Sequence, residues 1–135
     1  MAIRILIVDD DETIRGLVRR LIQEHSGWIV CGEASNGFEA VTQINQSSPD
    51  LVVMDLAMPR MNGIQAAREI SRTHPDLPML LLTVQQVERA LIYEARSAGF
   101  RGAVSKNTGS EVVKGIEALL RKETFFWAGD PVATG

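Results

Sequence analysis

Five polar residues of this 135-residue chain follow short apolar runs, at positions where strands would end. They are Asp9 and Asp10 after Ile5-Leu6-Ile7-Val8, Asp55 after Leu51-Val52-Val53-Met54, Thr83 after Met79-Leu80-Leu81-Leu82, and Lys106 after Ala103-Val104. Carboxylates that lie close together repel one another unless a cation is present, and oxygen ligands suit Mg²⁺. The metal, a lysine and a hydroxyl together stabilise the charge of a phosphoryl group. The residue types therefore predict Mg²⁺-dependent transfer of a phosphoryl group to a carboxylate.

The apolar runs are continuous rather than alternating, which is typical of strands covered on both faces of a parallel sheet. A weaker run extends from Trp28 to Cys31. Between the runs, apolar residues recur at helical spacing. These stripes are Ile14, Leu17, Val18, Leu21 and Ile22; Phe38, Val41 and Ile44; Ile64, Ala67 and Ile70; Val87, Leu91, Ala95 and Ala98; and Val112, Ile116, Leu119 and Leu120. Thr108 followed by Glu111, and Asn36 followed by Glu39, fit N-terminal caps.

This alternation predicts an α/β fold of the (βα)₅ type, a parallel sheet with helices on both faces. We expect five strands in the flavodoxin-like order 2-1-3-4-5. In that order the carboxyl ends of the first and third strands are neighbours, where open sheets of this kind bind ligands. The five polar residues are therefore expected to meet at one edge of the sheet.

Composition narrows the class of protein. The net charge is −3 and no run of Lys and Arg exceeds a pair, so we do not expect this chain alone to bind DNA. The single cysteine, Cys31, excludes an internal disulfide. No apolar run reaches the roughly 20 residues of a membrane span, and the first residues lack a signal-peptide layout. We expect a cytoplasmic protein without a membrane partner, with one domain at 1–122 and a tail or linker at 123–135.

Each polar residue also has a structural explanation. Asp9 and Asp10 could cap the first helix, and Asp55 could be a turn residue. Thr83 could be structural and Lys106 a solvated lysine. The functional interpretation is favoured because all five fall at the same end of the predicted sheet.

The segments around these five polar residues resemble those of the receiver domain of two-component response regulators. The matching segments are Ile7-Val8-Asp9-Asp10, Met54-Asp55-Leu56-Ala57-Met58-Pro59-Arg60-Met61-Asn62-Gly63, Leu82-Thr83 and Ser105-Lys106. The resemblance covers roughly residues 3 to 122, and the segment from Asp55 to Gly63 is its most specific part.

The resemblance implies a role for each residue. Asp55 would accept the phosphoryl group, and Mg²⁺ would be bound by Asp10, by Asp9 directly or through water, by Asp55, and by the backbone carbonyl of Ala57. Lys106 would pair with the phosphoryl group, and Thr83 would hydrogen-bond to it in the switching step. The donor would be a phosphohistidine on a sensor histidine kinase. The chain would be no enzyme acting on a separate substrate, but a phosphoacceptor that assists its own phosphorylation and dephosphorylation.

Three positions depart from the family pattern. Ala103 stands where the family commonly has an aromatic residue that reports the switch, and Val84 stands where a smaller residue is common. Asn107 follows Lys106 where Pro is common, which resembles the subfamily with a LuxR-type helix-turn-helix output domain. DNA binding would then need an output domain absent from this chain. Homodimerisation on phosphorylation is left open.

Two other interpretations stay open. Asp9-Asp10-Asp11-Glu12-Thr13 looks like the opening motif of haloacid-dehalogenase-type phosphohydrolases, with Asp9 as nucleophile and Asp11 as acid/base. Gly129-Asp130 only faintly echoes that family's last motif, and Asp55 would have no role. A degenerate receiver that acts as a binding module is the other alternative. The aromatic segment 125–127 either closes over the last helix or belongs to a dimer contact or linker.

Overall fold

Strands and helices alternate along the chain in the computed structural model, which describes residues 2–107 and 109–126. The strands are β1 (Ile3–Val8), β2 (Trp28–Ala34), β3 (Leu51–Asp55), β4 (Met79–Thr83), β5 (Gly102–Ser105) and β6 (Phe125–Phe126). The helices are α1 (Glu12–Gln23), α2 (Gly37–Ser47), α3 (Gly63–Thr73), α4 (Arg89–Ala98) and α5 (Gly109–Leu120). None of these described helices has the length and apolar composition to cross a bilayer. The predicted parallel α/β architecture is confirmed.

The sheet has the order β2-β1-β3-β4-β5-β6, with every neighbouring pair parallel. The expectation of five strands was therefore wrong by one. After α5 the chain reverses through Lys122, which has a positive φ of 65°. It then returns beside β5, where the Phe125 amide donates to the Arg101 carbonyl at 3.0 Å. Gly102 leaves room for this strand, because a Cβ there would lie 2.6 Å from the Phe125 carbonyl oxygen.

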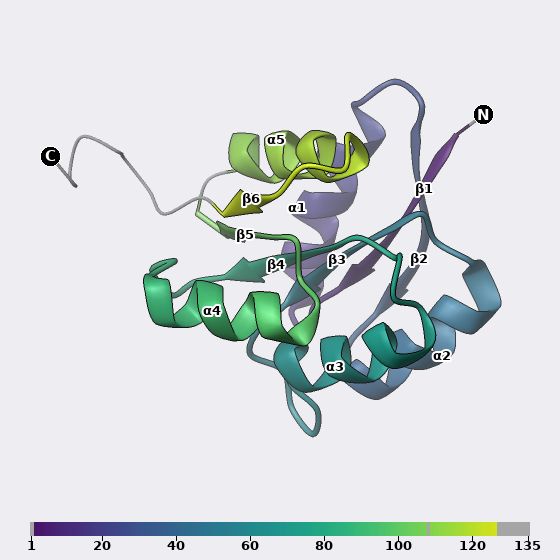
Figure 1. Cartoon of the computed structure of the whole chain (residues 1–135). Coiled ribbons are helices and arrows are strands. Elements are labelled where there is room, and N and C mark those ends of the chain that lie inside the picture. Colours follow the sequence, from purple (N-terminus) through teal and green to yellow (C-terminus); the bar gives the residue numbers. More distant parts are fainter. Residues whose placement is uncertain (1, 108, 127–135) are drawn as a thin grey trace, which may run out of the picture.

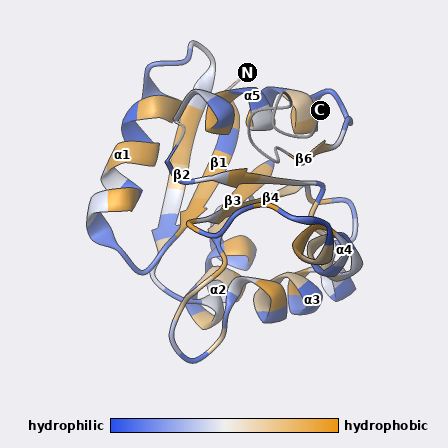
Figure 2. Cartoon of the chain, turned by 90° about the vertical axis from the view of Figure 1, so that its left-hand side faces the viewer, coloured by the Kyte–Doolittle hydropathy of each residue, from blue (hydrophilic) through white to orange (hydrophobic). Residues whose placement is uncertain are grey.

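The sheet separates two apolar layers, with α1 and α5 on one face and α2, α3 and α4 on the other (Figure 1). Alternate residues of each inner strand enter opposite layers: Ile5 and Ile7 pack with α1 and α5, whereas Leu6 and Val8 pack with the other three helices. In Figure 2 the inner strands are largely orange, while the helices alternate between orange and blue along their length. Burial on both faces explains the continuous apolar runs of the sequence.

Strand β6 contributes to both layers. Phe125 packs against the layer of α1 and α5, and Phe126 packs against the opposite layer. Phe126 is the register partner of the fully buried Ala103, and the Arg96 guanidinium carbon lies 5.2 Å from the centre of its ring. An aromatic ring thus packs beside β5, although β5 itself carries alanine. Trp127 lies outside the described residues.

Side-chain caps fix where α2 and α3 begin. The Asn36 side chain accepts from the Glu39 amide at 2.9 Å, which confirms the predicted cap of α2. Asn62 and Gln65 form a reciprocal capping box at the start of α3. The predicted box of Thr108 with Glu111 falls on Thr108, outside the described residues. The cap at Asn62 fixes the end of the loop that follows Asp55.

Candidate metal centre at the carboxyl edge of the sheet

Three carboxylates meet at the carboxyl ends of β1 and β3, as predicted. One oxygen each of Asp9, Asp10 and Asp55 lies within 4.8 Å of the others. Asp9 and Asp55 are buried, and Asp10 is exposed. The sheet order places β1 directly beside β3, so residues 45 positions apart in the sequence become neighbours.

Lys106 links two of these carboxylates. Its Nζ lies 2.8 Å from Asp9 Oδ2 and 2.9 Å from Asp55 Oδ1, and its side chain is 10% exposed. The Lys106 amide donates to the Thr83 carbonyl at 2.9 Å, which anchors the residue to the end of β4. The alternative that Lys106 is a solvated surface lysine is therefore wrong.

The carboxylate cluster fits a divalent cation. Asp9 Oδ2 is buried, and within the described residues it is left without a hydrogen-bond partner although the Lys106 ammonium lies 2.8 Å away. A buried carboxylate oxygen in this state favours a cation. Ligands of one Mg²⁺ ion lie at most about 4.2 Å apart. A small inward movement or a bridging water would therefore complete the coordination of an ion by Asp9, Asp10 and Asp55.

Burial and crowding change the protonation of the cluster. The pKa of Asp55 is raised from 3.8 to about 6, mainly by burial. The charge of Asp9 and a hydrogen bond with Asp10 also act to raise this pKa, whereas the hydrogen bond and charge of Lys106 act to lower it. Burial also acts to lower the pKa of Lys106, but its contacts with Asp9 and Asp55 outweigh this and raise that pKa. Without a metal, the carboxyl group of Asp55 therefore loses its proton less readily than an ordinary aspartate, whereas Lys106 keeps its positive charge.

A pH dependence of stability follows for the metal-free protein. The folded state holds a proton on Asp55 that the unfolded chain has already lost, so the free energy of unfolding should fall as pH rises from 3.8 to about 6. Urea denaturation of the wild-type and of Asp55→Asn across this window measures the effect as the difference between the two curves. Mg²⁺ should move the fall to lower pH because it favours the carboxylate. If the free energy of unfolding of the wild-type, relative to that of Asp55→Asn, stays constant or rises with pH in this window, the raised pKa of Asp55 is contradicted.

Thr83 and Ala57 lie at the same edge. Thr83 is buried at the end of β4, which lies between β3 and β5, and its hydroxyl accepts from the Gln85 amide at 3.0 Å. Asp55 ends β3, and Lys106 follows β5. Ala57 is exposed in the loop two residues after Asp55. The next position after Thr83 is Val84, whose side chain is 69% exposed. All residues predicted for the site are thus found at one edge of the sheet.

The loop after Asp55 packs against the strand through Gly63, the first residue of α3. A Cβ at this position would lie 2.3 Å from the Asp55 carbonyl oxygen and 3.2 Å from Leu56 Cα. The Gly63 amide also donates to the Leu56 carbonyl at 2.9 Å. A glycine is therefore required for the helix to approach the acceptor strand this closely.

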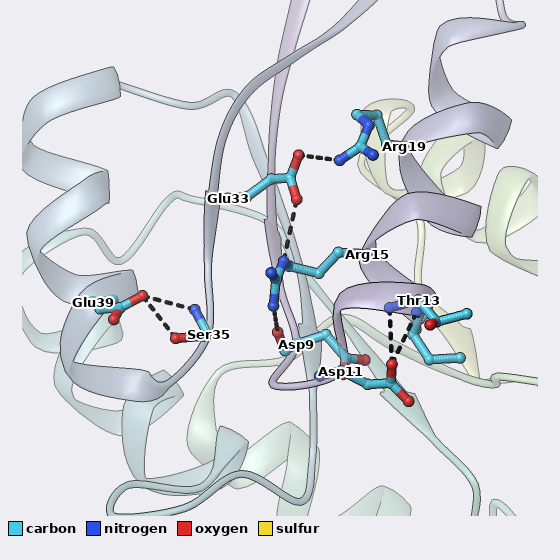
Figure 3. A network of polar contacts seen from close by, with 9 residues as sticks. Asp9, Asp11, Thr13, Arg15, Arg19, Glu33, Ser35 and Glu39 are labelled. Atoms are coloured by element: carbon cyan, nitrogen blue, oxygen red, sulfur yellow. Dashed lines mark hydrogen bonds and ion pairs between the residues drawn. The ribbon is translucent and has the colours of Figure 1, made fainter.

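Asp11, and neither Asp9 nor Asp10, caps α1. Its Oδ1 accepts from the Thr13 amide at 2.8 Å and from the Ile14 amide at 3.4 Å (Figure 3). The alternative that Asp9 or Asp10 is the cap was therefore wrong, and neither carboxylate is used to cap the helix. An N-cap is also an ordinary structural role for the residue that the phosphohydrolase interpretation made an acid/base.

Asp11→Ala should lower the free energy of unfolding by about 1 kcal/mol, because two amides of the first turn lose their acceptor. Asp11→Ser is the matched control, since a serine hydroxyl also caps well and should recover most of the loss. Thermal or urea unfolding measures both variants. Phosphorylation should continue in each, and its complete loss in Asp11→Ser would instead favour the acid/base role.

Sequence inspection missed two residues behind the cluster. Arg15, from the first turns of α1, donates from Nη1 to the Asp9 carbonyl at 2.7 Å and from Nε to Glu33 at 3.2 Å. Glu33 lies on β2 and also accepts from Arg19 at 2.5 Å. The sequence contained only a weak indication of this contact. Arg15 and Arg19 are four residues apart in a predicted helix, and Glu33 is an acidic residue close to an apolar run.

The comparisons with known proteins agree with this geometry. The family described as "Response regulator receiver domain" matches residues 5–117. The chain is similar to the response regulator UvrY of Escherichia coli K12, with 37% identity over 91% of this chain and 56% of that protein. It is also similar to the transcriptional regulatory protein YdfI of Bacillus subtilis, with 36% identity over 82% of this chain and 51% of that protein. This chain thus spans about half the length of these curated relatives.

Solved structures show the same fold. A LuxR-family two-component response regulator from Aurantimonas sp. SI85-9A1 has a TM-score of 0.90 and 34% identity, covering 98% of this chain and 94% of that one. The receiver domain of the putative response regulator NarL from Mycobacterium tuberculosis has a TM-score of 0.82 and 29% identity, covering 89% and 97%. These matches give no support to a phosphohydrolase. The chain belongs to the response regulator receiver domain family of two-component systems.

Proposed function

We propose that this receiver domain accepts a phosphoryl group on Asp55 in a Mg²⁺-dependent reaction and switches conformation in response. The observation that carries the proposal is the meeting of Asp9, Asp10 and Asp55 at one edge of the sheet, with Lys106 in contact with two of them. The degenerate-receiver alternative has less support, because the acidic set and the lysine are all present and assembled.

In the proposed reaction a carboxylate oxygen of Asp55 attacks phosphorus, and the bond from phosphorus to the donor nitrogen or oxygen breaks. The leaving group keeps the electron pair of that bond, and the product is an acyl phosphate on Asp55. No general base is needed because the carboxylate is already a nucleophile. Bound Mg²⁺ would stabilise the charge of the phosphoryl oxygens. Asp9 and Asp10 would hold the ion together with the Ala57 carbonyl.

Lys106 and Thr83 would respond to the added charge by contacting the phosphoryl group. Phosphorylation adds about one negative charge at an edge where Lys106 already contacts Asp55. The Thr83 hydroxyl, which now accepts from the Gln85 amide, would donate to a phosphoryl oxygen, and this change would couple the site to the loop before α4. The donor class is a phosphohistidine of a sensor histidine kinase, and small acyl phosphates would substitute for it. DNA would be reached only through an output domain.

Intact-mass spectrometry tests the proposal directly. Incubation with acetyl phosphate and Mg²⁺ should add one group of about 80 Da, and the same incubation with excess chelator should add none. Addition of Mg²⁺ to the chelated sample should restore the adduct. An adduct that forms equally well without a divalent ion, or no adduct under any of these conditions, would refute the Mg²⁺-dependent mechanism.

A further inference from the structure

We infer that Arg15 is a positioning residue for the metal centre, fixing the peptide unit between Asp9 and Asp10 while Glu33 holds its guanidinium in place. This inference rests on the proposed function, because it assumes that Asp9 and Asp10 bind a cation. Arg15 lies on α1, Glu33 on β2, and Asp9 just after β1, so the contact joins three elements (Figure 3).

The geometry restricts Asp9 from three directions. The Asp9 amide donates to the Ala34 carbonyl at 3.0 Å, which extends the ladder between β1 and β2. Asp9 Oδ1 accepts from the Asp11 amide at 2.9 Å, and the Asp9 carbonyl accepts from Arg15 at 2.7 Å. Oδ2 then faces Lys106 and the other carboxylates. One side-chain oxygen is thus used for positioning and the other is left for the site.

The bond to the Asp9 carbonyl also affects Asp10. A peptide unit is planar, so fixing this carbonyl fixes the direction in which the chain enters Asp10. Asp10 is exposed, and its orientation therefore depends on its backbone more than on surrounding packing. Since Arg15 is 18% exposed and Glu33 29% exposed, their ion pair is partly shielded from water.

Arginine suits this task because its rigid fork makes two bonds at once. Nη1 reaches the carbonyl while Nε remains on Glu33. A lysine could donate to either group but has no fixed geometry between them. Arg19 also contacts Glu33, at 2.5 Å, but no contact with the Asp9 carbonyl is found for it within the described residues. Arg19 therefore serves as a matched control of equal charge.

Charge and positioning predict opposite effects on the affinity for Mg²⁺. Removing a positive charge near the carboxylates should strengthen cation binding. Removing the hydrogen bond from Arg15 to the Asp9 carbonyl should instead weaken Mg²⁺ binding. Loss of contacts that support metal ligands typically lowers metal affinity 10- to 100-fold, so we expect a fall of about tenfold for Arg15→Gln. A fall in affinity would therefore identify positioning, since the charge change alone cannot cause it.

The experiment is calorimetric titration of the full, unphosphorylated chain with Mg²⁺, for wild-type, Asp10→Ala, Arg15→Gln, Arg15→Lys and Arg19→Gln. We expect the Kd of Arg15→Gln to rise about tenfold, Arg15→Lys to recover part of the loss, and Arg19→Gln to change it by less than about twofold. Amide exchange without metal gives an independent readout. The Asp11 amide should exchange faster in Arg15→Gln than in Arg19→Gln, because its acceptor is Asp9 Oδ1.

The outcomes separate the inference from the function on which it rests. Mg²⁺ binding that is lost in Asp10→Ala but equal or tighter in Arg15→Gln would overturn the positioning role alone. No Mg²⁺ binding by the wild-type would overturn the proposed metal site and this inference together. If Arg15→Gln fails to fold, Arg15→Lys provides the test, because it keeps the positive charge and removes the fixed geometry of the guanidinium. It should still weaken Mg²⁺ binding, and an affinity equal to that of the wild-type would overturn the positioning role of Arg15.

Discussion

Asp55→Asn is expected to abolish the phosphoryl adduct that acetyl phosphate and Mg²⁺ produce on the wild-type chain. An amide has no carboxylate to attack phosphorus, while its size and shape are almost those of the aspartate. Near neutral pH the variant should be at least as stable as the wild-type. The raised pKa of Asp55 means that its ionised form destabilises the folded state, and asparagine carries no such charge. Intact-mass spectrometry after a fixed incubation measures the result, and the expected yield is zero.

Asp76→Asn is the matched control for this loss. Asp76 is an exposed aspartate in the connection between α3 and β4, and its substitution makes the same chemical change. It should leave the adduct at its wild-type level. Retention of the adduct in Asp55→Asn, with the phosphoryl group found on Asp9, would refute the assignment of the acceptor and restore the phosphohydrolase alternative.

Gly63→Ala should lower the free energy of unfolding by about 3 kcal/mol, at the upper end of the usual cost of overpacking. The new Cβ would lie 2.3 Å from the Asp55 carbonyl oxygen, which is backbone and cannot turn aside as a side chain would. The helix or the acceptor strand must therefore move. Because the displaced group belongs to Asp55 itself, the rate of phosphorylation should fall as well.

Gly16→Ala is the control for this substitution and should act in the opposite direction. Gly16 lies inside α1, and a Cβ there would contact only Arg19 Nη2, at 3.6 Å. Alanine in a helix interior is typically favoured over glycine by about 0.5–1 kcal/mol. Urea denaturation of both variants compares them directly. Similar gains in the two variants would contradict the close approach of α3 to Asp55.

The site was predictable from the sequence because parallel sheets follow strong rules. Continuous apolar runs required burial on both faces, and burial required strands whose carboxyl ends share an edge. The polar residues directly after those runs could therefore be brought together without knowledge of any distance. The family resemblance then assigned roles, and the structure brings oxygens of Asp9, Asp10 and Asp55 within 4.8 Å of one another, with Lys106 in contact with Asp9 and Asp55.

Two features could not be predicted by the same reasoning. Strand β6 consists of two residues, too few to show any periodicity, and it exists because Gly102 and Lys122 permit its approach. The contact of Arg15 with the Asp9 carbonyl depends on how α1 is rotated against β2. Hydrophobic spacing gives that rotation only approximately, so an inward-facing arginine is hard to distinguish from a solvated one.

Strand β6 also bears on where this domain can be cut. A fragment that ended at residue 122 would lose the two phenylalanines that pair with Gly102 and Ala103. The backbone amides and carbonyls of β5 would then form an open sheet edge beside apolar side chains, which is a template for association between chains. Fragments intended for crystallisation or for kinase assays should therefore retain Phe126, so that the far edge of the sheet is protected from aggregation.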